Sequence, residues 1–327
     1  MAAYTTIDDS EANHQIVNWT GDQSEKAITL AGDTDMQPDL VWVKGRSFSD
    51  TGGIFDSVRG ATKLLIPNTE AAESTVAQSL KSFDSDGFTM GTESALNKSS
   101  NGMVAWCWKE SVASGLDILT YTGNATARTI AHNLSVKPNF ILVKKQSASG
   151  GSWFVYNTAA VPATHYIKLN ETGAIGAGDL WNDVEPTSSV FSLGTSSDVN
   201  GDGITYVAYV FASIQGFSKF GSFSGNGNAD GTFVYTGFKP KTLLVKSTAS
   251  GGGFYMMPTL TSWYNGDTYF NYPYSTTTES NSLFIDFHAN GFKCRKNDDC
   301  NNAATYGFYC WAEAPLVNSN GVPCNAR

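Results

Sequence analysis

The sequence predicts an all-β protein made of three tandem β-sandwich repeats, jelly-roll-like and about 100 residues each. The composition is the first observation behind this prediction. Among 327 residues, 13% are aromatic and only 16% are charged, and Gly, Ser, Thr and Asn gather between short apolar runs. That pattern is typical of short strands joined by turns. The second observation is a set of four sequence anchors that recurs three times in a fixed order.

The clearest anchor is a proline followed by an apolar run that ends in Val-Lys. It reads PDLVWVK from Pro38, PNFILVK from Pro138 and PKTLLVK from Pro240, at separations of 100 and 102 residues. Upstream, the glycines of NWTGD, TYTGN and SFSGN recur every 102 residues. Downstream, GFTMG, VFSLG and GFKCR align, and the closing runs are MVAWCWKE, YVAYVFAS and YGFYCWAE. Because independent anchors keep one period, we interpret them as a true internal repeat.

Each repeat is expected to hold about seven short strands, a number typical of a β-sandwich. The predicted domains are residues 1–115, 116–216 and 217–327, the last with a C-terminal tail. Gly115 and Gly216 are followed at once by the next strand, so linkers are short. A solenoid is the alternative, but its repeats run roughly 20 to 50 residues. One helix is expected, over residues 70–80.

The cysteines follow the repeat rather than a disulfide pattern. Cys107 and Cys310 occupy the place of a valine in the second repeat, and Cys294 aligns with apolar residues, so these three are predicted to be core residues. Cys300 and Cys324 have no apolar counterpart, and a disulfide between them is an open alternative. No spacing of cysteine and histidine suggests zinc.

The charge pattern argues against some partners. The net charge of -9 opposes sequence-independent nucleic-acid binding, which depends on neutralising phosphates. The three predicted domains carry -8, -2 and +1, from 8 basic and 16 acidic, 5 and 7, and 8 and 7 residues. No apolar run approaches the roughly 20 residues needed to span a bilayer. The first residues, MAAYTTIDDSEANH, also lack a basic start and an apolar stretch, so we expect no signal peptide and no membrane insertion.

No catalytic motif is recognisable, and we expect no catalytic residue, cofactor or metal. There is no HExxH, GxSxG or phosphate loop. The four histidines fall at unrelated positions of their repeats, namely His14, His132, His165 and His288. Two carboxylate pairs, Asp84 with Asp86 and Asp183 with Glu185, lie in turn-like sequence. We interpret them as solvated turn residues, although a glycosidase pair is the alternative.

The stretch DVNGDGITY, residues 198–206, begins like a calcium loop. A loop of the EF-hand type needs a glutamate at its twelfth position, and here that position is Tyr209. Asp-Gly and Asn-Gly also supply the positive φ of a tight turn. The sequence therefore predicts a hairpin turn before the closing strand.

The third repeat carries an aromatic segment, LTSWYNGDTYFNYPY, that the other repeats lack. Aromatic rings with Asn and Asp between them suit a carbohydrate or a protein partner. The alternative is that alternate rings fill the core of the third repeat. The predicted binding residues are Trp263, Tyr264, Tyr269, Tyr272 and Tyr274.

The whole pattern resembles a repeat family of tailed bacteriophages, especially marine and cyanobacterial ones. The resemblance rests on AYTTIDDSEANHQIVNWTGD, MQPDLVWVKGRS, SFDSDGFTMGT, HNLSVKPNFILVK, LWNDVEPTSSVFSLG and GFSKFGSFSGNGNADG, and it covers nearly the whole chain. Members of that family are mostly uncharacterised virion or tail-fibre-like proteins. The aromatic segment and the ending APLVNSNGVPCNAR depart from the pattern.

The resemblance implies a non-enzymatic structural protein of a tailed-phage virion, exposed on the particle. A tail fibre or receptor-binding appendage is preferred, with a capsid decoration protein as the alternative and a carbohydrate-binding adhesin as a second one. Implied partners are other tail or capsid proteins, further copies of the chain, for example in a trimer, and a host surface glycan. The implied location is the virion.

Overall fold

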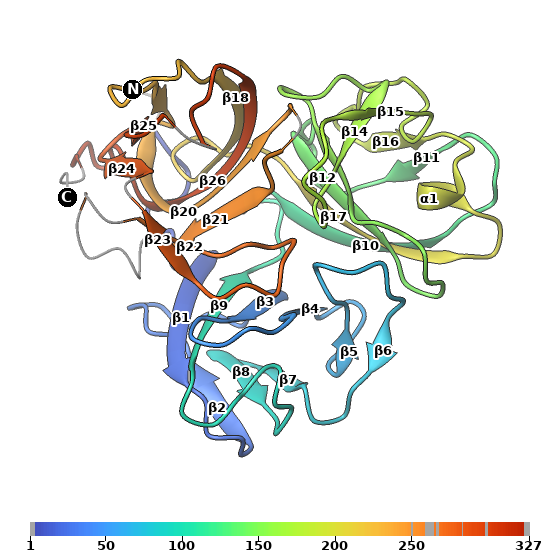
Figure 1. Ribbon diagram of the computed structural model, residues 1–327, viewed down its shortest axis with the longest axis horizontal. Helices are drawn as coiled ribbons and strands as arrows, with labels where there is room; N and C mark the ends of the chain where they lie inside the picture. The colour runs from blue at the N-terminus through green and yellow to red at the C-terminus, as the bar shows by residue number, and fades with distance from the viewer. Residues whose placement is uncertain are drawn as a thin grey trace.

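A computed structural model describes residues 4–249, 251–258, 265, 268–282, 284–297 and 300–323. Over those ranges the chain consists of antiparallel strands and one short helix, so the all-β prediction is confirmed. Figure 1 shows three groups of strands arranged around a common centre. We call them unit 1 (β1 to β9), unit 2 (β10 to β17) and unit 3 (β18 to β26).

The strand bounds are as follows. Unit 1 has β1 (His14–Thr20), β2 (Lys26–Thr29), β3 (Leu40–Gly45), β4 (Gly53–Asp56), β5 (Lys63–Leu64), β6 (Ser74–Thr75), β7 (Leu80–Asp84), β8 (Gly87–Met90) and β9 (Gly102–Trp108). Unit 2 has β10 (Leu116–Thr122), β11 (Arg128–Ala131), β12 (Phe140–Lys145), β13 (Phe154–Asn157), β14 (His165–Lys168), β15 (Gly176–Ala177), β16 (Val190–Leu193), α1 (Ser197–Asn200) and β17 (Thr205–Phe211). Unit 3 has β18 (Ser218–Ser224), β19 (Phe233–Tyr235), β20 (Phe238–Ser247), β21 (Phe254–Pro258), β22 (Thr268–Phe270), β23 (Ser280–Ser282), β24 (Ile285–His288), β25 (Gly291–Cys294) and β26 (Thr305–Pro315).

The main sheet has the same strand order in all three units. It runs β1-β9-β3-β4 in unit 1, β10-β17-β12-β13 in unit 2 with β14 and β15 added at the edge, and β18-β26-β20-β21 in unit 3. A second, smaller sheet accompanies each main sheet: β2-β8-β7, β11-β16 and β19-β25-β24. The anchors that align in the sequence therefore occupy matching places in the sheets.

The proline-led strands lie in the interior of their sheets. Every residue of β3 and β12 is buried, which explains why each strand begins with a continuous apolar run, LVWV or FILV, instead of alternating. Both strands begin two residues after their proline. In β20 the proline lies inside the strand, and the register to β26 shifts on both sides of Pro240. A bulge is expected there because proline has no N–H to donate to the ladder.

The hydrophobic core is shared among the units. One cluster of buried side chains belongs to unit 1 and another to unit 2, whereas the largest cluster contains residues of all three. The ends of the closing strands meet at the centre of the ring. There Trp311 packs 5.3 Å from Trp108 and 5.5 Å from Phe211 between ring centroids. These three residues line a central apolar cavity of about 30 Å³, so each unit completes the packing of the others.

Two local predictions were wrong. Residues 70–80 form no helix, because backbone groups of Glu70 and Glu73 bond to unit 2. Residues 198–206 form no hairpin, since β16 pairs with β11 while β17 pairs with β10 and β12. The one-turn helix α1 lies there instead, with Ser196 as its N-cap. The buried amide of Asn200 donates to Thr126 O and Gly194 O, which ties this connection to the small sheet.

The core assignment of three cysteines is confirmed. Cys107, Cys294 and Cys310 are fully buried, and burial raises the pKa of each thiol. Cys300 is buried as well. Cys324 lies outside the described residues, so its bridge to Cys300 stays a prediction. The described part of the chain contains no helix of the length and apolarity needed to cross a membrane.

Candidate functional site

Three buried lysines mark the boundaries between units, which we call seams. They are the lysines that end the Val-Lys anchor: Lys44, Lys144 and Lys246. Lys44 Nζ donates to the carbonyl of Asp50 in its own unit at 2.7 Å. It also donates to the carbonyl of Ser275 in unit 3 at 2.6 Å. One side chain thus holds a loop of its own unit and a loop of the neighbouring unit.

The same arrangement recurs at the other two seams. Lys144 Nζ contacts Gly151 O within unit 2 and Thr69 O of unit 1, and Lys246 Nζ contacts Gly252 O within unit 3 and Gly173 O of unit 2. Burial lowers the pKa of all three lysines to about 8. Sequence reasoning treated Val-Lys as a repeat marker only. The sequence does contain a signal for these sites, because a lysine ends the apolar run in all three repeats.

Backbone hydrogen bonds also cross each of the three seams. Glu73 N donates to Gln146 O at 2.8 Å, Ile175 N to Thr248 O at 3.1 Å, and Glu279 N to Arg46 O at 2.9 Å. These bonds join unit 1 to unit 2, unit 2 to unit 3, and unit 3 back to unit 1. The units therefore form a closed ring in which every seam uses equivalent backbone positions.

The seam between units 1 and 2 also contains a buried ion pair. Arg59 Nε lies 2.5 Å from Asp56 Oδ2, and both side chains are almost completely buried. Tyr209 of unit 2 donates its hydroxyl to the same carboxylate at 2.7 Å. Burial disfavours the charge of Arg59, but Tyr209, Asp56 and Glu73 outweigh that effect and raise its pKa.

All five N–H donors of Arg59 are used within the protein. Besides Asp56, the guanidinium donates to Glu73 at 3.0 Å and to the Tyr209 hydroxyl at 3.2 Å. The remaining two donors bond to the carbonyls of Lys63 and Ile54. A polar surface cleft of about 490 Å³ lies beside this network. Because no guanidinium donor is left for a ligand, we interpret Arg59 as a structural residue.

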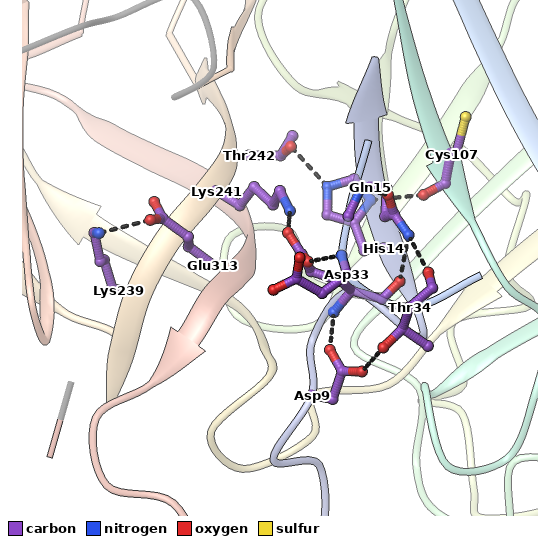
Figure 2. A network of polar contacts seen from close by, with 12 residues as sticks. Asp9, His14, Gln15, Asp33, Thr34, Cys107, Lys239, Lys241, Thr242 and Glu313 are labelled. Atoms are coloured by element: carbon purple, nitrogen blue, oxygen red, sulfur yellow. Dashed lines mark hydrogen bonds and ion pairs between the residues drawn. The ribbon is translucent and has the colours of Figure 1, made fainter. Parts of the chain in front are cut away.

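His14 belongs to the seam between units 3 and 1 (Figure 2). Its Nδ1 lies 2.9 Å from Cys107 O, and its Nε2 lies 2.7 Å from Thr242 Oγ1 of unit 3. A carbonyl can only accept, so Nδ1 carries the proton and Nε2 accepts from threonine. The ring stacks on Trp108 with centroids 4.9 Å apart. Burial, with Lys241 nearby, lowers the pKa of His14 to about 3.

An ion pair closes the exposed side of this seam. Lys241 Nζ of unit 3 lies 2.9 Å from Glu11 Oε1, just before β1. Figure 2 shows Lys241 near this segment, in which Asp9 accepts a hydrogen bond from Thr34 in the connection between β2 and β3. The segment before β1 is thereby fixed to unit 3. Tyr4 adds a hydrogen bond of 2.7 Å to Gly237 O.

A group of carboxylates lies at the link between units 1 and 2. Asp39, Glu110 and Asp117 each accept a backbone N–H, from Glu110, Ile118 and Asn133 respectively. Burial and then the charge of Asp117 raise the pKa of Glu110 to about 7, against the hydrogen bond from Ile118. These backbone contacts indicate that the carboxylates fix the link in place.

Replacing a seam lysine is expected to destabilise the whole ring. Lys144→Met leaves the carbonyls of Gly151 and Thr69 without their donor, at about 1–3 kcal/mol for each group that stays buried. We expect a loss of about 2–4 kcal/mol, measured by urea unfolding. The control is Lys137→Met, whose exposed pair with Glu185 contributes little. Equal stability of the two variants would contradict the role of Lys144 in holding units 1 and 2 together.

The predicted aromatic residues are only partly described. Trp263 and Tyr264 lie outside the described residues. Tyr269, Tyr272 and Tyr274 are half-buried. Tyr272 packs against Tyr255 and Phe270, and Tyr274 lies against Gly253, where even a Cβ atom would clash with its ring. Rings of this segment therefore contribute to packing in unit 3, and their role in binding stays a prediction.

Three of the four paired carboxylates have partners within the protein, and the fourth, Asp183, is exposed. Asp84 accepts from Ser82 and Thr89, and Asp86 accepts from the backbone of Met36. Glu185 pairs with Lys137 at 2.8 Å. These contacts support the interpretation of both pairs as turn residues.

Among the residues that the structure describes, no three His, Cys, Asp or Glu side chains form a group that could hold a metal ion. Asp198, which opens DVNGDG, lies 3.7 Å from Lys145 and is partly exposed. Its neighbour Asn200 is buried and bonds to the backbone. The side chains of Asp198 and Asn200 therefore do not converge on one point, as the ligands of a calcium loop must.

Comparison with known proteins places the chain in a family. No curated protein matches the chain at a significant level. A family model described as a domain of unknown function, DUF7483, matches residues 9–315. That range includes every strand and all three seams. The chain therefore belongs to the DUF7483 family.

Proposed function

We propose that this protein is a non-enzymatic structural protein of a tailed-phage virion, exposed on the particle as part of a tail fibre or receptor-binding appendage. The observation that supports this most is the closed ring of seams. Equivalent lysines and backbone bonds join each unit to the next. Such interlocking suits a rigid module that must keep its shape outside a cell.

The proposal includes the origin of the ring. We propose that its units are three copies of one jelly-roll-like β-sandwich, with boundaries near residues 115 and 216. The recurring strand order and the recurring seam lysines support common ancestry of the units.

The use of buried charges favours a structural role over an enzymatic one. Arg59 and His14 have all their hydrogen-bonding groups occupied by protein atoms, and each seam lysine donates to carbonyls of two units. An active site instead presents a perturbed group to a substrate in a cleft. The perturbed groups at these seams are thus explained by the assembly of the ring.

A capsid decoration protein is the alternative location, and copy number separates the two. We propose to image virions with a gold-labelled antibody against the chain and to count copies per particle by quantitative mass spectrometry. Labelling of the tail with few copies supports the appendage. Labelling of the head at a number near the capsid count supports decoration, and absence from purified particles contradicts both.

The oligomeric state needs its own measurement. Light scattering on the purified chain tests the predicted homo-oligomer. A trimer is the expected form, and a monomer at all concentrations would contradict it.

A further inference from the structure

An exposed pair of aromatic rings lies on β19 of unit 3. Phe233 is 45% exposed and Tyr235 is 49% exposed, while Val234 between them is buried. Alternate residues of a strand point to the same face, about 7 Å apart. Among the exposed large apolar side chains of the described residues, these two are the aromatic ones. We call this pair, with Tyr4 and Lys219, the β19 patch.

The fold does not require aromatic residues at these positions. Val234 pairs with Phe292 in the same way that Ile28 pairs with Phe88 and Ile130 with Phe191. The outward neighbours of those buried residues are Ala27 and Thr29 in unit 1, and Thr129 and Ala131 in unit 2. Two of three copies thus build the strand with small side chains. The Phe233 ring packs edge-on against His288, with centroids 5.8 Å apart, but about half of each ring stays exposed. Binding is the usual explanation for exposed aromatic residues.

Polar groups surround the rings. The Tyr4 hydroxyl lies 3.3 Å from that of Tyr235, and Lys219 Nζ lies 5.4 Å from the centroid of the Tyr235 ring. Lys219 Nζ also donates to Tyr235 O at 2.8 Å. Two surface hollows of about 300 and 370 Å³ share Lys219 and Tyr235, and hydroxyls such as those of Ser222 and Thr236 line them. Tyr235 therefore lines two surface hollows that contain both apolar surface and hydrogen-bonding groups.

The charge of Lys219 is not balanced by a carboxylate. Within the described ranges it forms no ion pair, whereas Lys239 pairs with Glu313 and Lys293 with Asp230. By strand register, its counterpart in unit 2 is Asp117. An ammonium carries three donors, and one of them is used by Tyr235 O. The patch therefore combines flat apolar faces with a positive charge that can meet an anion.

We propose that the β19 patch binds an acidic oligosaccharide, which is an inference that rests on the proposed function at the virion surface. Sugar rings stack their C–H faces on Phe233 and Tyr235, hydroxyls bond within the hollows, and an acidic group pairs with Lys219. A stable protein interface buries about 800 Å² on each partner. Two rings set among Ser, Thr and Gly residues favour a small ligand over such a surface.

The test uses the whole purified chain and two probes of equal length, trigalacturonic acid and galactotriose, followed by calorimetry. The wild type is expected to bind the acidic trimer more tightly. Phe233→Thr with Tyr235→Ala copies the residues of unit 2 and should weaken binding at least tenfold without changing the melting temperature. Lys219→Gln should remove the preference for the acidic trimer.

A control variant places the rings elsewhere. Thr129→Phe with Ala131→Tyr in the Phe233→Thr/Tyr235→Ala background puts the same rings beside Asp117, and acidic binding should not return. No binding of either trimer by the wild type, or unchanged binding after loss of both rings, overturns the inference. Binding of a virion protein to the patch, without binding of either sugar, also overturns the inference. Location on the virion is measured separately, so failure of sugar binding leaves the proposed function intact, and absence from virions leaves a measured sugar affinity intact.

Discussion

Arg59→Ala is expected to cost about 3–5 kcal/mol of unfolding free energy, because it leaves the buried Asp56 carboxylate without its cation. The Tyr209 hydroxyl remains as one donor, but it cannot balance a charge. Urea unfolding of the purified variant measures the loss. The seam between units 1 and 2 should be the weakest part of this variant, with faster hydrogen exchange around β4 and β17.

Unit 2 supplies the matched control for this prediction. By strand register, Asn157 stands where Asp56 stands, and Ala160 stands where Arg59 stands. Asn157 Oδ1 accepts the N–H of Ala160, as Asp56 Oδ1 accepts that of Arg59. The double variant Asp56→Asn/Arg59→Ala should therefore recover part of the lost stability. A double variant weaker than Arg59→Ala alone would show that the ion pair is not the cause.

Acid is expected to weaken the ring through His14. The pKa of His14 is about 3 in the folded chain and 6.5 in the unfolded one, so the unfolded chain binds more protons between these values. Stability should fall as pH decreases from 6.5 towards 3. The loss from this residue is about 2 kcal/mol at pH 5 and about 4 kcal/mol at pH 3. Chemical unfolding at a series of pH values measures it.

His14→Asn isolates this effect from other titrating groups. The asparagine amide can still donate to Cys107 O, but it does not titrate. The variant should be less stable at pH 7, because it loses the stacking on Trp108, and its stability should change less between pH 6.5 and pH 3. An identical slope in wild type and variant would mean that Glu11 or other carboxylates, not His14, cause acid sensitivity.

The repeat and the strand identities could be predicted from the sequence, because proline, the buried run and the closing run are local signals. The seams could not, because each joins residues about 75 to 230 positions apart, as for Lys144 with Thr69 and Lys44 with Ser275. The error at residues 70–80 has the same origin. Their backbone groups are used by another unit, and no local propensity reports that.

The candidate binding residues show a related difference. The aromatic segment of residues 260–274 is conspicuous in the sequence, yet the described rings within it are half-buried against unit 3. Phe233 and Tyr235 are inconspicuous in TFVYTG, and only their exposure distinguishes them. Alignment of the three small sheets would have shown that their counterparts are Ala and Thr. That comparison requires a strand register that the sequence leaves open.

At two seams the polypeptide chain itself connects the neighbouring units, and at the third seam it does not. Peptide bonds cross from β9 to β10 and from β17 to β18, while units 3 and 1 meet only through contacts such as His14 with Thr242 and Lys241 with Glu11. The backbone N–H of Ser319 bonds to Asp8 at 2.6 Å across the same split. The ring can therefore open at this seam without breaking a covalent bond, although the hydrogen bonds and the ion pair across it would be lost. Force or acid should therefore act first at this seam, where His14 must stay uncharged for units 3 and 1 to remain in contact.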